Sequence, residues 1–158
     1  LEIFFVAPTI VPIPTTRVSI PEHYYTLAEE PDDLAIFDYP TRRAKTSMIP
    51  TEYFYYQSIH NKPIPYAIKD SWIDRKELWA HMTRNQQSGG RDIEKQLSRF
   101  STEEIQKTFD DLQSKGFGFF IVHKKLLEKG TIIEHKRLFN SIMGEPKYED
   151  SEIIRYDL

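Results

Sequence analysis

The chain has 158 residues, a formal net charge of −3 and no cysteine. This length suits a single folded domain, and 39% hydrophobic with 28% charged residues indicates a packed core rather than disorder. The missing cysteine excludes disulfides, thiolate catalysis and cysteine-bound zinc or iron–sulfur sites, and the acidic balance argues against a nucleic-acid partner.

Residues 1–18 are predicted to be extended. The stretch from Leu1 to Pro14 is almost wholly apolar and contains three prolines, which fix φ and bias the preceding residue away from helix. It is too short and too interrupted to cross a bilayer, which takes about 20 apolar residues. We expect residues 1–18 to be a proline-rich exit from an upstream membrane region, and residues 19–158 to form one domain.

The first elements of that domain follow from capping and hydropathy. Ser19 to Glu22 matches a capping box and predicts a short helix that runs through Ala28 and ends before Pro31. The apolar run over residues 34–39 is bounded by polar residues and proline, and it predicts a buried strand.

A second helix is predicted over residues 51–60, opened by Pro50 and stopped by Asn61. Residues 63–68 should then be extended. A capping box at residues 74–77 predicts a further helix, and the Ser-Gly-Gly sequence within residues 84–91 marks a candidate mobile loop.

The strongest helix start in the chain is Ser101-Thr-Glu-Glu104, and its helix should end at Gly116. The apolar residues 117–123 follow directly and predict a central strand.

The last part of the chain predicts one helix and a hairpin. Thr131-Ile-Ile-Glu134 matches a capping box, and its helix should stop at Gly144. Residues 147–149 and 152–156 predict two strands of a closing hairpin.

Strands that alternate with helices predict an α/β domain. We expect a small mixed sheet with parallel central strands, formed by residues 34–39 and 117–122, with flanking helices and a C-terminal β-hairpin at an edge.

The run of aromatic residues from Tyr53 to Tyr56 is the most unusual local feature. A helix would spread these rings over more than one face. One interpretation is a groove for a sugar or lipid-linked ligand, in which rings stack and polar groups bond. Its candidate residues are Tyr53, Tyr55, Tyr56, Gln57 and His60. The alternative is packing, with His60 tying down the turn over residues 62–65.

No metal or cofactor site is expected. The five histidines have no ligand-like spacing, and the chain has no Walker lysine loop, no G-x-G-x-x-G and no nucleophile elbow.

An alternative enzyme hypothesis is metal-dependent phosphodiester cleavage. Glu134-His-Lys136 is an E-x-K triplet after two isoleucines, and Asp110 or Asp111 could supply an upstream carboxylate beside Mg²⁺. The pattern needs the triplet on a strand, whereas Thr131 predicts a helix start here and both aspartates fall within a predicted helix.

Several segments together resemble one known arrangement. They are residues 12–28, 34–40, the stretch Tyr55-Tyr-Gln-Ser-Ile-His-Asn-Lys-Pro-Ile64, residues 119–124 and residues 144–150. They resemble the C-terminal soluble region of large bacterial polytopic membrane proteins similar to family-39-type, lipid-linked-sugar glycosyltransferases. In such proteins the membrane spans come first, and the tail runs from a proline-rich exit to a closing hairpin.

The resemblance implies a location and partners for this chain rather than a reaction that it catalyses. In such glycosyltransferases the catalytic carboxylate lies in a membrane-proximal loop near the first spans, which has no counterpart here, so no catalytic residue carries over. The resemblance adds Lys62 to the candidate ligand-binding residues. It implies an extracytoplasmic, membrane-associated location, with the upstream transmembrane region and a glycan or lipid-linked sugar as partners.

We therefore expect a non-catalytic accessory or binding domain of a glycosyltransferase-like membrane protein. The alternatives are a stand-alone, metal-dependent nuclease-like enzyme and a purely structural domain.

Overall fold

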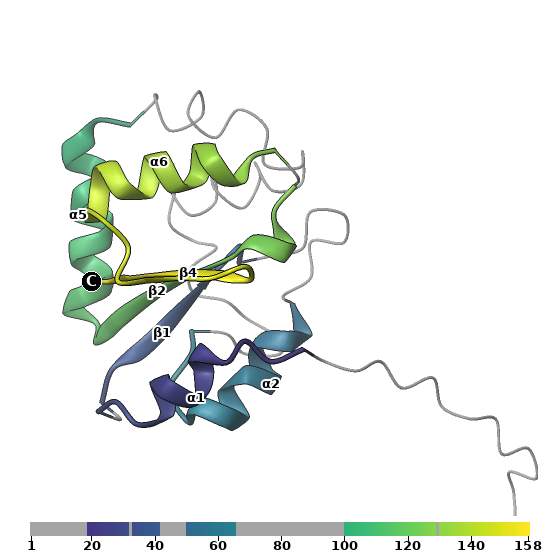
Figure 1. The fold of residues 1–158 in the computed structure, drawn as a ribbon. Coiled ribbons are helices and arrows are strands. Elements are labelled where there is room, and N and C mark those ends of the chain that lie inside the picture. The colour runs from purple at the N-terminus through teal and green to yellow at the C-terminus, as the bar shows by residue number, and fades with distance from the viewer. Residues whose placement is uncertain (1–18, 32, 42–49, 66–99, 129) are drawn as a thin grey trace, which may run out of the picture.

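The computed structural model describes residues 19–31, 33–41, 50–65, 100–128 and 130–158. These residues form a mixed four-stranded sheet in the order β1-β2-β4-β3, with helices on both faces (Figure 1). The predicted α/β class with a C-terminal hairpin is confirmed. The predicted extended segment 1–18, the helix from residue 74 and the loop over 84–91 lie outside the described residues.

The sheet is built on a parallel pair. Strand β1 (Ala35–Tyr39) pairs with β2 (Phe117–His123), and all residues of both strands are buried. Continuous burial explains why both strands are apolar apart from Asp38 and His123. Gly118 is required by close approach, because a Cβ there would lie 2.7 Å from the side chain of Leu34.

The outer side of β1 meets the chain segment that follows the second helix. The Ile36 N–H donates to the carbonyl of Pro63 at 2.9 Å. This bond places the start of the predicted extended segment beside β1.

The C-terminal hairpin is present as predicted. Strand β4 (Ile153–Asp157) pairs antiparallel with β2, and β3 (Tyr148–Glu149) pairs antiparallel with β4. Asp150 shapes the turn, because its Oδ1 accepts from the backbone N–H of Glu152 at 2.7 Å and of Ile153 at 2.8 Å.

Helices α1 (His23–Ala28) and α2 (Thr51–His60) cover one face of the sheet (Figure 1). Helix α2 ends at Asn61, whose φ of 56° is the left-handed cap conformation that asparagine tolerates. The predicted capping box at Ser19 is wrong. The helix starts four residues later, out of its reach, and the Ser19 hydroxyl instead donates to Glu152 at 3.2 Å.

Helices α5 (Thr102–Ser114) and α6 (Ile132–Met143) cover the other face (Figure 1). The predicted capping box of α5 is confirmed. The Ser101 hydroxyl accepts from the Glu104 N–H at 3.1 Å, and the Glu104 carboxylate accepts from the Ser101 N–H at 2.7 Å. Gly116 follows the helix at a φ of +87°, which favours glycine.

The predicted capping box of α6 is wrong, although the helix and its stop at Gly144 are confirmed. Thr131 has φ −92° and ψ −10°, whereas a capping side chain needs an extended backbone to turn back over the first N–H groups. Its hydroxyl donates instead to the carbonyl of Glu128 at 2.9 Å.

The face under α5 and α6 is an aromatic core centred on Phe120. Its ring centroid lies 5.4 Å from Phe37, 5.4 Å from Phe109 and 4.9 Å from Phe139. Such ring pairs add to the burial of apolar area and fix how the helices sit on the sheet.

None of the helices in the described ranges combines the length and the apolar character needed to cross a bilayer.

Candidate functional site

The sheet face under α1 and α2 carries buried polar side chains where the other face carries rings. Asp38, His123 and Arg155 come from three different strands and are 0%, 3% and 5% exposed. Buried charges are costly unless they are paired and hydrogen-bonded, so each of these groups needs a partner. Their partners define the candidate site.

Asp38 and His123 form a buried pair with Tyr24 of α1. The Tyr24 hydroxyl donates to Asp38 Oδ1 at 2.9 Å, and His123 Nε2 lies 2.8 Å from the same oxygen and 3.1 Å from the Tyr24 hydroxyl. A carboxylate oxygen only accepts, so the network assigns the Nε2 proton to the bond with Asp38.

The parallel pairing brings these two residues together. Asp38 is the fourth residue of β1 and pairs in register with Ile121, two residues before His123 at the end of β2. The carboxyl ends of parallel strands meet at one edge of a sheet, which is where open α/β sheets bind their ligands.

Aromatic rings enclose the pair. The centroid of Tyr53 lies 4.7 Å from that of His123, and Tyr56 stacks on His123 at 5.6 Å with an interplanar angle of 7°. Tyr24 stacks on Tyr56 at 4.7 Å. Burial, together with the charge of Asp38, raises the pKa of Tyr24 well above its usual value.

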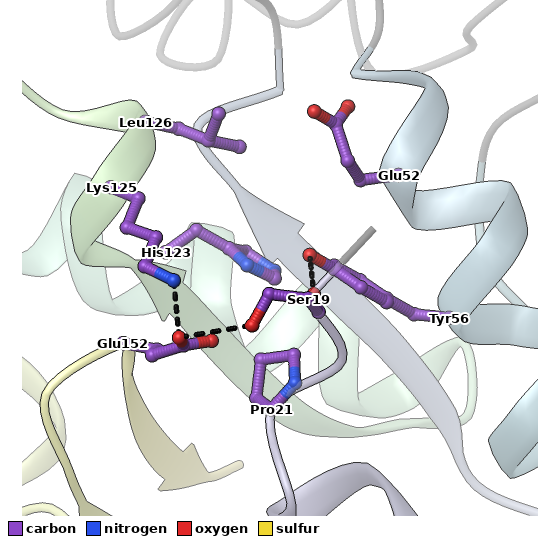
Figure 2. A pocket seen from close by; sticks show the side chains of 8 residues that line it. All are labelled: Ser19, Pro21, Glu52, Tyr56, His123, Lys125, Leu126 and Glu152. Atoms are coloured by element: carbon purple, nitrogen blue, oxygen red, sulfur yellow. Dashed lines mark hydrogen bonds and ion pairs between the residues drawn. The ribbon is translucent and has the colours of Figure 1, made fainter. Parts of the chain in front are cut away.

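A cavity of about 150 Å³ opens beside His123 (Figure 2). Its lining comes from the segment before α1, from α2, from the end of β2, from the 3₁₀ turn η3 (Lys124–Leu126) and from the β3–β4 turn. The lining side chains are Ser19, Pro21, Glu52, Tyr56, His123, Lys125, Leu126 and Glu152.

Three contacts join the walls of the cavity, as Figure 2 shows. Glu152 accepts from the Ser19 hydroxyl and pairs with the Lys125 ammonium, and the Tyr56 hydroxyl donates to the Ser19 carbonyl at 3.3 Å. These contacts hold parts of the chain that are far apart in sequence around one opening.

Only Tyr56 among the sequence-predicted ligand residues lines this cavity. Tyr55 is 49% exposed, whereas the Tyr53 hydroxyl is buried and donates to the Pro40 carbonyl at 2.7 Å. Gln57 donates to the carbonyl of Lys62 at 3.3 Å, and His60 Nδ1 accepts from the Lys62 N–H at 3.0 Å. The alternative in which His60 ties down the turn after the helix is confirmed.

Lys62 is fully buried. Its ammonium donates to the carbonyls of Glu30 at 2.9 Å and Pro31 at 2.6 Å, just after α1, and lies 5.7 Å from the ring centroid of Phe119. A cation is stabilised at the carbonyl end of a helix, so these contacts fasten α1 to the end of α2. Burial, with a smaller effect of Lys62, lowers the pKa of His60 to about 4.

Arg155 forms the second charged cluster of this face. Its guanidinium makes a bidentate ion pair with the Glu30 carboxylate, at 2.6 and 3.1 Å, and donates to Asp157 at 2.8 Å. His23 lies 3.2 Å from the same guanidinium, and burial together with that charge lowers the pKa of His23.

The nuclease-like candidates lie on helices. Asp110 and Asp111 are on α5, and Glu134 and Lys136 are on α6, whereas the pattern requires a strand. Lys136 pairs with Glu149, and Asp110 lines a second cavity of about 200 Å³ near the C-terminal end of the chain. Within the described ranges no three His, Asp or Glu side chains are grouped as a metal ion would require.

Sequence reasoning missed Asp38 and His123 as a pair. A usable signal was present, because each is a polar residue near the end of an otherwise apolar strand. Tyr24 gave no such signal, because its position on a short helix is typical of a core residue.

The chain matches no protein-family model, no curated protein and no solved structure.

Proposed function

We propose that this chain is a non-catalytic binding domain of a membrane-bound, glycosyltransferase-like protein, and that it holds a small polar ligand in the cavity beside His123. The observation that carries the proposal is the position of a buried, carboxylate-bound imidazole at an open cavity, at the carboxyl edge of two parallel strands.

The polar face supports a binding role over a purely structural one. Asp38, His123 and Arg155 occupy strand positions where apolar side chains would stabilise the fold without a desolvation cost. Clusters of buried polar groups beside a cleft are typical of functional sites. The second face of the same sheet, which is aromatic, shows the packing that a structural role requires.

The size of the cavity limits what can enter. At about 150 Å³ it is smaller than the roughly 300–1,000 Å³ of sites that enclose a drug-sized molecule. It suits one sugar ring, or the end of a longer molecule whose remainder lies outside. An acceptor glycan or a lipid-linked sugar meets this description.

The sequence resemblance supports the cellular location and the larger protein that the proposal assumes. It favours a domain on the extracytoplasmic side, following a transmembrane region of the same protein. There the domain would position an acceptor or a lipid-linked donor for a reaction that other parts of the protein carry out.

Binding is tested with the purified chain and a panel of neutral monosaccharides, followed by nuclear magnetic resonance of backbone amides. We expect shifts that gather at Tyr56, His123 and Glu152. The residues around the second cavity, such as Gln113, serve as an internal control. Shifts spread evenly over the domain, or none at millimolar sugar, would contradict the proposal.

The setting is tested on the intact parent protein in its native cells. Membranes are fractionated, and spheroplasts are treated with protease and probed with an antibody against this chain. We expect the chain to be membrane-bound and clipped from outside. Recovery in the cytosol would overturn the setting, and sugar transfer by the purified chain alone would overturn the non-catalytic role.

A further inference from the structure

We infer that helix α1 is an acid-released cover on the polar face of the sheet, which is the face under α1 and α2. Protonation of His23 and His60 detaches this helix and takes away one wall of the cavity beside His123. The effect on ligand binding rests on the proposed function, because it is a regulation of that same site.

His60 uses its imidazole as an acceptor where a second proton has no place. The residue is fully buried, and its Nδ1 accepts from the backbone N–H of Lys62 at 3.0 Å. An imidazolium only donates, so a proton on Nδ1 would set two N–H groups against each other and break this bond. Nε2 has no hydrogen-bond partner within the described ranges, so no acceptor there compensates for the new charge.

His23, which belongs to α1 itself, is held in the same way. The side chain is buried, and its Nε2 lies 3.2 Å from Nη1 of Arg155. A guanidinium donates and never accepts, so Nε2 is the acceptor in this bond. A proton on Nε2 would place a second donor and a second positive charge against Arg155.

The groups around the two rings determine the direction of the pH response. The titratable and charged groups that face them are Tyr24, Asp38 and Lys62 at His60, and Glu30, Tyr148, Asp150, Arg155 and Asp157 at His23. The cations oppose a second proton and the carboxylates favour one, but burial is the largest effect and lowers both pKa values, that of His60 to about 4. An unperturbed histidine has a pKa of 6.5, so falling pH favours the state in which α1 is detached and both rings meet water.

The contacts of α1 make it the element that this change releases. It has six residues, too few for a stable helix by itself, and its buried residues are His23, Tyr24 and Leu27. The chain just after it is held by the Lys62 ammonium, which donates to the carbonyls of Glu30 at 2.9 Å and Pro31 at 2.6 Å. The backbone N–H of the same lysine is the donor to His60. Segments with few buried apolar contacts open at a lower free energy than the core does.

Release of α1 reaches the cavity through the residues before the helix. Ser19 and Pro21 line the cavity (Figure 2), and α1 begins at His23. The bonds of Ser19 to Glu152 and Tyr56 lie at the exposed and half-buried rim. Once the helix has detached, the cavity opens on this side, and a ligand held beside His123 is released at low pH.

His135 on α6 is as buried as His60 but is bound differently. Its Nδ1 lies 2.7 Å from the carbonyl of Thr131 and therefore carries the proton, and its Nε2 lies 3.1 Å from the Tyr39 hydroxyl. A hydroxyl can donate or accept, so a second proton on Nε2 leaves both hydrogen bonds in place. His135 is therefore a matched control for the two histidines of the polar face.

The release is measured in single-cysteine variants, because the chain has no cysteine of its own. Leu27 on α1 and Leu112 on α5 are both fully buried, so L27C and L112C are a matched pair on opposite faces of the sheet. We expect the rate of labelling of L27C by a pyridyl disulfide, divided by that of L112C, to rise roughly tenfold or more between about pH 7 and about pH 4.5. The ratio cancels the pH dependence of the thiol reaction. An equal rise at both positions, or a constant ratio, would overturn the inference.

The two histidines are tested in the L27C background. H23Q and H60N keep an acceptor near the position of Nε2 and Nδ1, respectively, but do not titrate in this range. The double variant H23Q/H60N should therefore lose most of the rise in labelling, whereas H135Q should keep it. A rise of full size in H23Q/H60N, or an equal loss in H135Q, would exclude His23 and His60 as the trigger.

The wild-type chain gives a second measurement if a cysteine variant does not fold. Amide hydrogen exchange of Leu27, relative to that of Leu112, should accelerate over the same pH range. The amide signals of the cavity residues Tyr56 and Lys125 should shift with it, and that of Gln113 at the second cavity should not. Cavity signals that ignore the release would overturn the opening of the cavity. No ligand is present here, so the outcome is independent of the sugar-binding test of the proposed function.

Discussion

The two faces of the sheet use the same strands for opposite purposes. Under α5 and α6, alternate residues of β1, β2 and β4 provide Phe37, Phe120 and Tyr156, which pack as rings. Under α1 and α2, the intervening residues of the same strands include Asp38 and Arg155, which are held by specific polar partners. The first face therefore stabilises the fold by burial, and the second face carries the candidate site.

The aromatic face should give the largest single effect on stability. F120A removes a fully buried ring from the centre of the cluster and leaves a cavity. We expect the free energy of unfolding to fall by about 3–5 kcal/mol. Chemical denaturation measures the loss, and a loss below about 1 kcal/mol would show that this face is not the main core.

On the polar face, which is the sheet face under α1 and α2, stability should depend on ion pairing rather than on buried apolar area. R155M leaves Glu30 without its guanidinium, and we expect a loss of about 3 kcal/mol, near the lower end for a broken buried pair because the Glu30 side chain is 32% exposed.

The double variant E30Q/R155M tests whether this loss comes from the pair. It should be clearly less destabilised than the sum of the two single variants, as a double-mutant cycle measures. Additive losses would mean that the pair with Glu30 contributes little, and that Arg155 acts through its other contacts. These include Asp157 at 2.8 Å and the Phe119 ring, whose centroid lies 4.5 Å from the guanidinium carbon.

Low pH should reduce the free energy of unfolding through His60, which lies on the polar face. Its pKa is about 4 in the fold, whereas an unperturbed histidine has a pKa of 6.5, so between these pH values the unfolded chain binds more protons. The free energy of unfolding should therefore fall as the pH drops from 6.5 to 4, by on the order of 2–3 kcal/mol from this residue. Burial lowers the pKa of His23 and His135 in the same direction.

H60N isolates this contribution, because asparagine can place an acceptor where Nδ1 meets the Lys62 N–H. Stability measured at several pH values should vary less in H60N than in the wild type over this window. Parallel pH curves for the two proteins would assign the acid sensitivity to other groups.

The smallest predicted effect on stability is the difference between Ser101, whose predicted capping box is confirmed, and Ser19, whose predicted capping box is wrong. S101A removes the capping bond of α5 and should cost about 1 kcal/mol. S19A removes an exposed contact with Glu152 and should cost only a few tenths of a kcal/mol. Equal losses in thermal unfolding would mean that the segment before α1 matters more to the fold than its contacts indicate.

Much of the fold followed from local patterns. The helix over residues 51–60 and the strand over 117–123 have strong boundaries, in Pro50 and Asn61 for the first and in Gly116 for the second. The predicted capping boxes at Ser19 and Thr131 were wrong, although each matched the expected spacing of residues. A cap depends on backbone geometry and on the distance to the first helical turn, and a spacing of polar residues fixes neither.

The candidate site was predicted less well, because it depends on strand register. The aromatic run suggested a groove, yet within it only Tyr56 reaches the cavity, and His60 and Lys62 serve the connection to α1. Asp38 and His123 are 85 positions apart and meet only because β1 and β2 are parallel with one particular alignment. The sequence indicated only that both polar residues lie near the end of an apolar strand.

The hydrogen bond from Ile36 to Pro63 has a consequence for self-association. An edge strand with unpaired N–H groups can recruit a strand from another molecule and start aggregation. Here the N–H of Ile36, on a strand buried along its whole length, is already occupied by the chain's own carbonyl. At the opposite end of the sheet β3 is only two residues long, too short to template a new strand. Within the described residues, these two features discourage growth of the sheet at both ends.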